Sequence, residues 1–142
     1  MSIFDIWKSK KPKPIDRVEL DKLGSVVWSD DDESWQGLVD GISFFIGIDD
    51  SSDRPIQPLI DYTESALLND WLRDAVNAAK DKYAADHPQF ADELADLSIE
   101  SVHVYLRKGS RHLNCHLGYG ASDRFWALDF IDYRCTGMGF DT

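Results

Sequence analysis

Histidine and cysteine gather in one short segment of the chain, His112-Leu-Asn-Cys115-His116. Imidazole nitrogen and thiolate sulfur are ligands that zinc prefers, so this segment raises the question of a metal site. The alternation of apolar residues around it predicts a β-strand, on which successive side chains point to opposite faces. His112 and His116 then share one face at a separation of ~13 Å, and Cys115 points to the other face. The spacing therefore disfavours a metal site within this strand.

A neighbouring strand supplies a third histidine, His103, which could approach one of the other two imidazoles. Whether His103, His112 and His116 come together in space is left open by the sequence. The same holds for the two cysteines, Cys115 and Cys135, which are too few for a disulfide framework and fit a reducing compartment. We interpret both cysteines as small core residues, and we predict no metal and no cofactor.

Two acidic segments, residues 30–33 and 49–53, are the next candidates. Both resemble oxygen-rich calcium loops, but neither has the glycine at the sixth position and the glutamate at the twelfth that a helix-loop-helix calcium site requires. They are therefore either solvated turns that protect strand edges or an anionic patch for a cationic partner. The candidate partner-binding residues are Asp30, Asp31, Asp32, Glu33, Trp35, Asp49, Asp50 and Asp53.

Motifs for enzymatic chemistry are missing from the sequence. The chain has no Gly-x-Ser-x-Gly segment for a nucleophilic serine. The glycine pairs Gly118/Gly120 and Gly137/Gly139 lack the third glycine and the following helix of a dinucleotide site. We predict no catalytic residues, and a small hydrolase or metal-dependent enzyme, which would need the histidines gathered in one cleft, stays an alternative.

The charge of the chain limits its partners. The 142 residues carry a net charge of −11, and because the first 17 residues carry +3, residues 18–142 carry −14. A nucleic-acid-binding surface needs a surplus of lysine and arginine, so this balance argues against nucleic acid as a partner. The same charge suits a basic protein, which it would steer toward the complex.

The first 14 residues differ from the rest in composition, so we expect a basic tail at 1–14 and a single domain at 15–142. The tail combines a few apolar residues with lysines and prolines, which is compatible with weak contact to an anionic membrane surface. A membrane-peripheral accessory protein is therefore an alternative function. The residues that would make this contact are Ile3, Phe4, Ile6, Trp7, Lys8, Lys10, Lys11 and Lys13. Neither a spanning segment nor a signal peptide is recognisable, which predicts a cytoplasmic protein.

The elements that would position these residues follow an α+β order. Residues 17–49 alternate as strands with a hairpin signal at Asp40-Gly41, which predicts an N-terminal antiparallel meander. An apolar stripe between Leu67 and Tyr83 at the 3.6-residue period predicts either one long central α-helix or two shorter ones. Residues 102–140 return to strand alternation as a C-terminal meander. We expect the helical stripe to pack on one face of an antiparallel β-sheet, with the two meanders sharing that sheet or forming two.

Four segments together resemble a known group of small bacterial domains of unknown function. They are residues 27–49, the helix through Trp71 and Tyr83, residues 97–102 and residues 125–141. Related domains occur as immunity proteins of polymorphic and contact-dependent toxin systems. The resemblance implies a non-catalytic cytoplasmic domain that neutralises a toxin by stoichiometric binding. It carries no motif residues from which a site could be transferred. The acidic charge of the chain favours a basic toxin domain as this partner.

Overall fold

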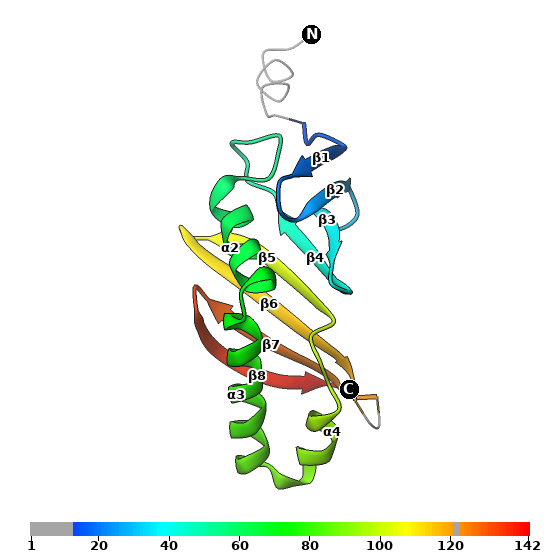
Figure 1. Cartoon of the computed structure of the whole chain (residues 1–142), viewed down its shortest axis with the longest axis vertical. Coiled ribbons are helices and arrows are strands. Elements are labelled where there is room, and N and C mark those ends of the chain that lie inside the picture. Colours follow the sequence, from blue (N-terminus) through cyan, green and yellow to red (C-terminus); the bar gives the residue numbers. More distant parts are fainter. Residues whose placement is uncertain (1–12, 121–122) are drawn as a thin grey trace, which may run out of the picture.

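The computed structural model describes residues 13–120 and 123–142. The described residues form a mixed α+β fold, shown in Figure 1. Its strands are β1 (Arg17–Leu20), β2 (Gly24–Ser29), β3 (Ser34–Val39), β4 (Ile42–Gly47), β5 (Ser101–Arg107), β6 (Ser110–Tyr119), β7 (Phe125–Ile131) and β8 (Arg134–Asp141). Its helices are α2 (Gln57–Leu68), α3 (Trp71–Asp86), the single 3-10 turn η1 (Pro88–Phe90) and α4 (Ala91–Ala95).

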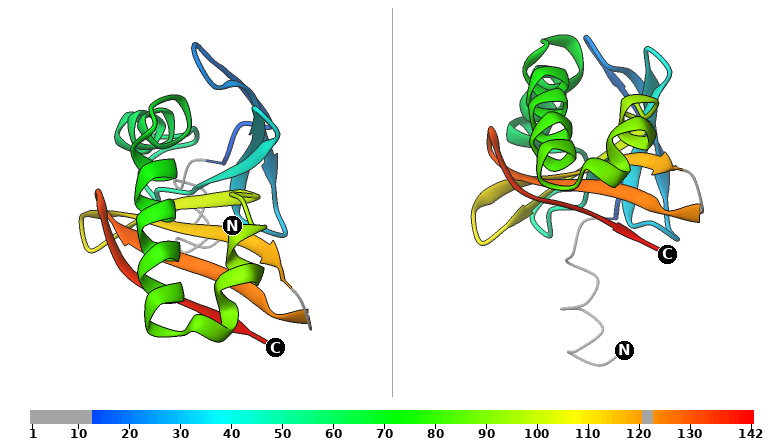
Figure 2. Two further views of the ribbon diagram at one scale, coloured as in Figure 1. Left: turned by 60° about the horizontal axis from the view of Figure 1, so that its bottom comes forward. Right: turned by 90° about the horizontal axis from the view of Figure 1, so that it is seen from below.

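All eight described strands belong to one sheet, in the order in which they occur along the chain. The two predicted meanders therefore share a sheet, and every neighbouring pair is antiparallel except β4 and β5, which are parallel. Because a parallel pair needs a crossover, the helices lie in the connection between these two strands. Figure 2 shows that the sheet curves and that the helices lie on one of its faces. The predicted fold class, with its two meanders and central helices, is confirmed.

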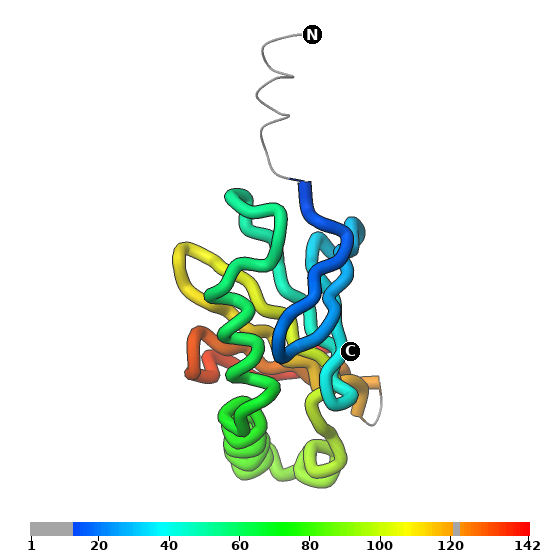
Figure 3. Tube along the Cα trace, turned by 45° about the horizontal axis from the view of Figure 1, so that its top comes forward, coloured from blue at the N-terminus to red at the C-terminus, as the bar shows by residue number. Residues whose placement is uncertain are grey.

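The helical stripe is interrupted, which decides between the two predicted alternatives. α2 ends at Leu68 and α3 begins at Trp71, and the two connecting residues, Asn69 and Asp70, lie outside both helices. α2 contacts β4, β5 and β6, whereas α3 contacts β8. The tube in Figure 3 follows the same path from the strands through the helices and back to the strands. Two shorter helices therefore cover the sheet instead of one rod.

The core lies between the helices and the sheet. From the helices it takes Leu59, Tyr62, Leu72, Val76 and Leu94, and from the sheet Val26, Trp35, Phe44, Ile46, Val102, Val104, Leu113, Cys115, Leu117, Trp126, Leu128 and Phe130. The sheet residues recur at every second position because strand side chains alternate between faces. None of the described helices lies on the other face of the sheet, which we call the open face.

Two glycine positions explain local features of β3 and its hairpin. Asp40 and Gly41 have φ of 49° and 79°, the pair of positive values that a type I′ hairpin turn requires. At Gly37 the ring of Phe44, its cross-strand neighbour, occupies the space of a side chain. A Cβ atom at Gly37 would lie 2.3 Å from Cζ of Phe44. Because Gly37 has no side chain, the ring of Phe44 can pack directly against the backbone of β3.

Candidate functional site

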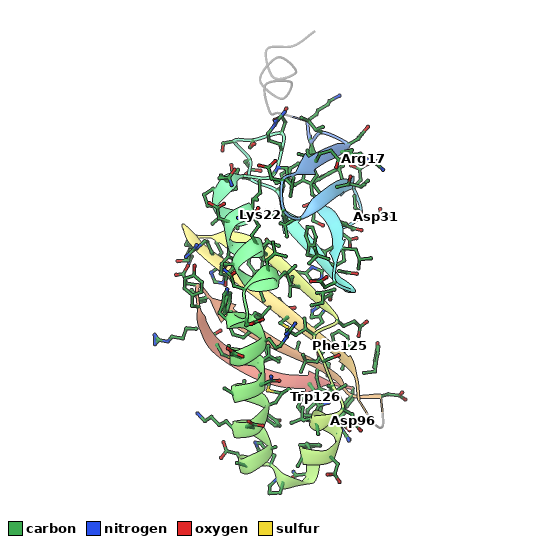
Figure 4. All side chains as sticks on the ribbon, in the orientation of Figure 1. Arg17, Lys22, Asp31, Asp96, Phe125 and Trp126 are labelled. Carbon is green, nitrogen blue, oxygen red and sulfur yellow. The ribbon has the colours of Figure 1, made fainter. Side chains whose placement is uncertain are left out.

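The two acidic segments lie at the same end of the sheet. The 30–33 turn joins β2 to β3, and the 49–53 loop follows β4. Because Ser34 at the start of β3 pairs with Gly47 at the end of β4, both segments leave the sheet at this end. Figure 4 labels Asp31 on the outer side of this turn. We call the two segments together the acidic end.

The carboxylates of the acidic end are open to solvent. Asp30, Asp31, Asp32, Glu33 and Asp50 are exposed, and Asp49 and Asp53 are half-buried. Hydrogen bonds from the hydroxyl and the backbone N–H of Ser51 lower the pKa of Asp49. A carboxylate that accepts such bonds keeps its charge to more acidic pH. The acidic end thus presents a concentrated negative charge at neutral pH.

Trp35 does not belong to this surface, so its prediction as a contact residue was wrong. Its side chain has 0 % exposure and lies on the helix-covered face of β3. The indole nitrogen Nε1 donates a hydrogen bond to the carbonyl of Ile15 at 3.0 Å. Trp28 packs against it at 4.8 Å between ring centroids and donates from its own Nε1 to Asp30 at 2.6 Å. Trp35 therefore supports the acidic end from inside the core.

A continuous row of aromatic and imidazole rings crosses the open face next to the acidic end. Phe45 on β4 stacks on His103 on β5, with ring centroids 4.2 Å apart. His103 in turn lies 4.9 Å from His116, which lies 5.0 Å from Phe125, which lies 5.1 Å from Tyr119. We call these five side chains the ring row. Aromatic residues of this kind are enriched in protein interfaces.

The histidines divide between two places. His103 lies beside His116, an approach that the sequence left open, whereas His112 stacks on Tyr105 at 5.2 Å. Burial lowers the pKa of both His103 and His116, and repulsion from His116 adds to the lowering at His103. Within residues 13–120 and 123–142, no three side chains of the histidine, cysteine, aspartate and glutamate types form a group that could hold a metal ion.

A shallow depression connects the acidic end with the ring row. Its volume is about 290 Å³. Two carboxylates, a serine and two ring side chains take part in its lining, which consists of Asp32, Glu33, Ser34, Gly47, Ile48, His103, Val104 and Tyr105. Sequence reasoning missed the depression and the ring row. The alternation of Phe45, His103 and His116 with buried neighbours was the signal that these three rings share the open face.

The two cysteines are free thiols, and they sit in different surroundings. Cys115 is fully buried on the helix-covered face, and burial raises its pKa to about 12. Cys135 is only partly buried, on strand β8 at the edge of the sheet. A thiol with a raised pKa is a poor nucleophile, so Cys115 is a core residue in its chemistry as well as in its position.

A buried ion pair holds α4 in place on the helix-covered side of the sheet, opposite the ring row. The carboxylate of Glu93 is 6 % exposed and accepts hydrogen bonds from Nε of Arg124 at 3.0 Å and from Nε1 of Trp126 at 2.5 Å. The Arg124 guanidinium also lies over the ring of Phe90, 4.9 Å from its centroid. These contacts serve to attach α4 and η1 to β7. They lie on the helix-covered side, whereas the ring row lies on the open face.

The membrane prediction concerns residues that lie mostly outside the described ones. Of the eight side chains proposed to contact a membrane, seven belong to residues 1–12, and Lys13 is the exposed first residue of the described part. Among the described helices, none has both the length and the apolar composition to cross a bilayer.

Comparison with known proteins gave no match, either to a protein-family model, to a curated protein or to a solved structure.

Proposed function

We propose that this protein binds a basic protein partner through its acidic end and the adjacent open face. The supporting observation is that two acidic segments, about twenty residues apart in the sequence, are gathered at one end of the sheet beside the ring row. Carboxylates steer a basic partner and raise its association rate, and rings supply the surface that is desolvated on contact. The arrangement combines the two contributions that a protein interface needs.

The partner we propose is a basic toxin domain, which the protein neutralises in the cytoplasm as an immunity protein. Occlusion of a toxin by stoichiometric binding needs a complementary surface and no catalytic group in the inhibitor. Toxin domains that attack nucleic acids are basic on their working face because they bind phosphates. The net charge of −14 on residues 18–142 is complementary to such a face.

The direct experiment mixes the purified full chain with the toxin domain encoded beside its gene. We expect a one-to-one complex in size-exclusion chromatography and loss of toxin activity at equal concentration. No complex and no protection would overturn the proposal.

A charge variant tests which surface binds. Replacing all four carboxylates of the 30–33 turn by amides should slow association by about tenfold at low salt and by less at high salt, because electrostatic steering is screened by ions. A control variant removes the same charge from exposed aspartates on the helix side, as Asp81→Asn, Asp86→Asn, Asp92→Asn and Asp96→Asn. Stopped-flow measurement of both variants should show slow association only in the first. Equal slowing in both would show that net charge matters and that the acidic end does not.

A further inference from the structure

Strand β8 forms one edge of the sheet. It comes last in the strand order, and among the described residues no strand pairs with its outer side. In the antiparallel pairing with β7, every second residue of β8 turns its backbone N–H and C=O groups away from β7. A row of such groups is a template on which a further strand can pair. The outer side of β8 is therefore a surface that can bind an extended chain.

This edge lacks most of the features by which edge strands avoid pairing. β8 contains neither lysine nor proline, and it has 8 residues, against 4 in β1 at the other edge. A Cβ atom at Gly137 or Gly139 would meet no atom within 4 Å, so the backbone there is uncovered. A β-bulge at Thr136 interrupts the pairing with β7. Residues 137–141 are the regular stretch on which a further strand can pair.

Helix α3 covers one side of the space beyond this edge. It contacts β8, and Figure 1 shows that its second half extends past this last strand. A groove with a volume of about 580 Å³ lies between the helix and the strand. Ala75, Ala78 and Ala79 line it on the helix side, and Gly137 and Met138 line it on the strand side. The short side chains of the helix leave room for the longer side chains of an added strand.

The groove is basic although the domain is acidic. Lys82 and Arg134 line it together with a single carboxylate, that of Asp86, which gives a formal charge of +1. Residues 18–142 as a whole carry −14. In the part of the chain that the structure describes, neither Lys82 nor Arg134 forms an ion pair. Both cations are available to a carboxylate, so an acidic occupant matches the charge of the groove.

We propose that β8 and α3 together bind an extended acidic segment of another protein, which adds to the sheet as a further strand. Its backbone pairs with the outer side of residues 137–141, its apolar side chains enter the groove beside Ala79 and Met138, and a carboxylate contacts Lys82. In this mode of recognition, main-chain hydrogen bonds supply affinity and the groove selects side chains. The site includes neither the acidic end nor the ring row, so it does not rest on the proposed function.

The test titrates the ¹⁵N-labelled full chain with the blocked peptide acetyl-Val-Thr-Glu-Thr-Val-amide and follows the backbone amides by NMR. On a strand, the valines and the glutamate of this peptide share one face and the threonines share the other. We expect saturable shifts at the amides of Gly137, Met138, Gly139 and Ala79. Hydrogen exchange should slow at the outward amides of β8. Absence of saturable shifts at these amides would overturn the proposal.

Two control peptides separate the contributions of backbone and charge. Methylation of every backbone nitrogen keeps the side chains and removes the backbone donors, so this peptide should give no saturable shift. Lysine in place of the glutamate should weaken binding by about fivefold, because Lys82 and Arg134 then repel the peptide. Equal binding of the methylated peptide would show that no strand is added. Equal binding of the lysine peptide would show that the groove does not select an acidic segment, and either result would refute the proposal.

Two variants assign the effect to the groove. Ala78→Glu places a longer, negatively charged side chain in the groove and should weaken binding of the acidic peptide by about tenfold. Ala85→Glu, at an exposed position of the same helix outside the groove, should leave binding unchanged. Lys82→Gln should weaken binding by about threefold, whereas the exposed control Lys22→Gln should not. Glutamate is a good helix former, so both alanine variants should fold. Unchanged affinity in both Ala78→Glu and Lys82→Gln would contradict the assignment.

A second copy of this chain is the other possible occupant of the edge. Sedimentation of the full chain without peptide, together with hydrogen exchange, distinguishes the two. We expect a monomer in which the outward amides of β8 exchange freely. A dimer in which these amides are already protected would mean that two copies pair through β8, and the proposed occupant would be wrong.

Discussion

Substitution of Gly37 by alanine tests the packing of the sheet directly. The new Cβ atom would lie 2.3 Å from Cζ and 2.7 Å from Cε1 of Phe44, well inside van der Waals contact. The ring of Phe44 is fully buried and cannot rotate into solvent, so either the ring leaves its rotamer or β3 and β4 separate. Overpacking of a core by one methyl group costs about 1–3 kcal/mol. For a domain of this size we expect the melting temperature to fall by roughly 3–10 °C.

The measurement is thermal unfolding followed by circular dichroism, repeated in urea. Gly137→Ala is the matched control, because a Cβ atom there meets no atom within 4 Å, and it should be neutral or slightly stabilising. The double variant Gly37→Ala/Phe44→Leu should lose less stability than the sum of the two single variants, because the smaller side chain vacates the space. If Gly37→Ala has the same melting temperature as the unsubstituted protein, the ring of Phe44 does not cover Gly37. The packing described for β3 and β4 would then be wrong.

Two further predictions concern titratable groups. The lowered pKa of His103 and His116 means that the unfolded chain takes up protons first, so stability should fall as pH drops below about 6.5, the ordinary pKa of histidine. Melting curves of His103→Gln between pH 7.5 and 5 should show a smaller fall than those of the unsubstituted protein or of the exposed-site control His87→Gln, and an identical fall in all three would contradict the burial of this pair. Reaction with a thiol reagent at pH 8 should modify Cys135 in the native protein and leave Cys115 until denaturant is added, because the thiolate of Cys115 is suppressed by burial. Rapid modification of both thiols in the native state would contradict the core position of Cys115.

Much of the fold is predictable from local patterns. The period-two alternation around Phe44 and Leu113 places the strands and their buried faces, and Asp40-Gly41 places a hairpin. The parallel pairing of β4 with β5 is a different matter, since it joins residues more than fifty positions apart and no local pattern specifies it. The sequence therefore predicted two meanders without deciding whether they share a sheet.

The candidate site is predictable in part. The exposure of the acidic 30–33 turn can be predicted from its residue types, because charged residues in turns are mostly exposed. Trp35 was assigned to the surface because it follows this turn, but its position on β3 turns its side chain toward the helices. The depression beside the 30–33 turn depends on how β3, β4 and β5 lie relative to one another in space. A property of this kind has no signature in the sequence.

The parallel pairing of β4 with β5 also has a consequence for how the chain folds. Each meander is built from contacts between neighbours in sequence, which form quickly because they close short loops. The β4–β5 pairing brings Phe44 beside Val102 and closes a loop that contains all the described helices. This slow closure is the step that should limit the folding rate. The depression lined by β4 and β5 forms only when the closure is complete.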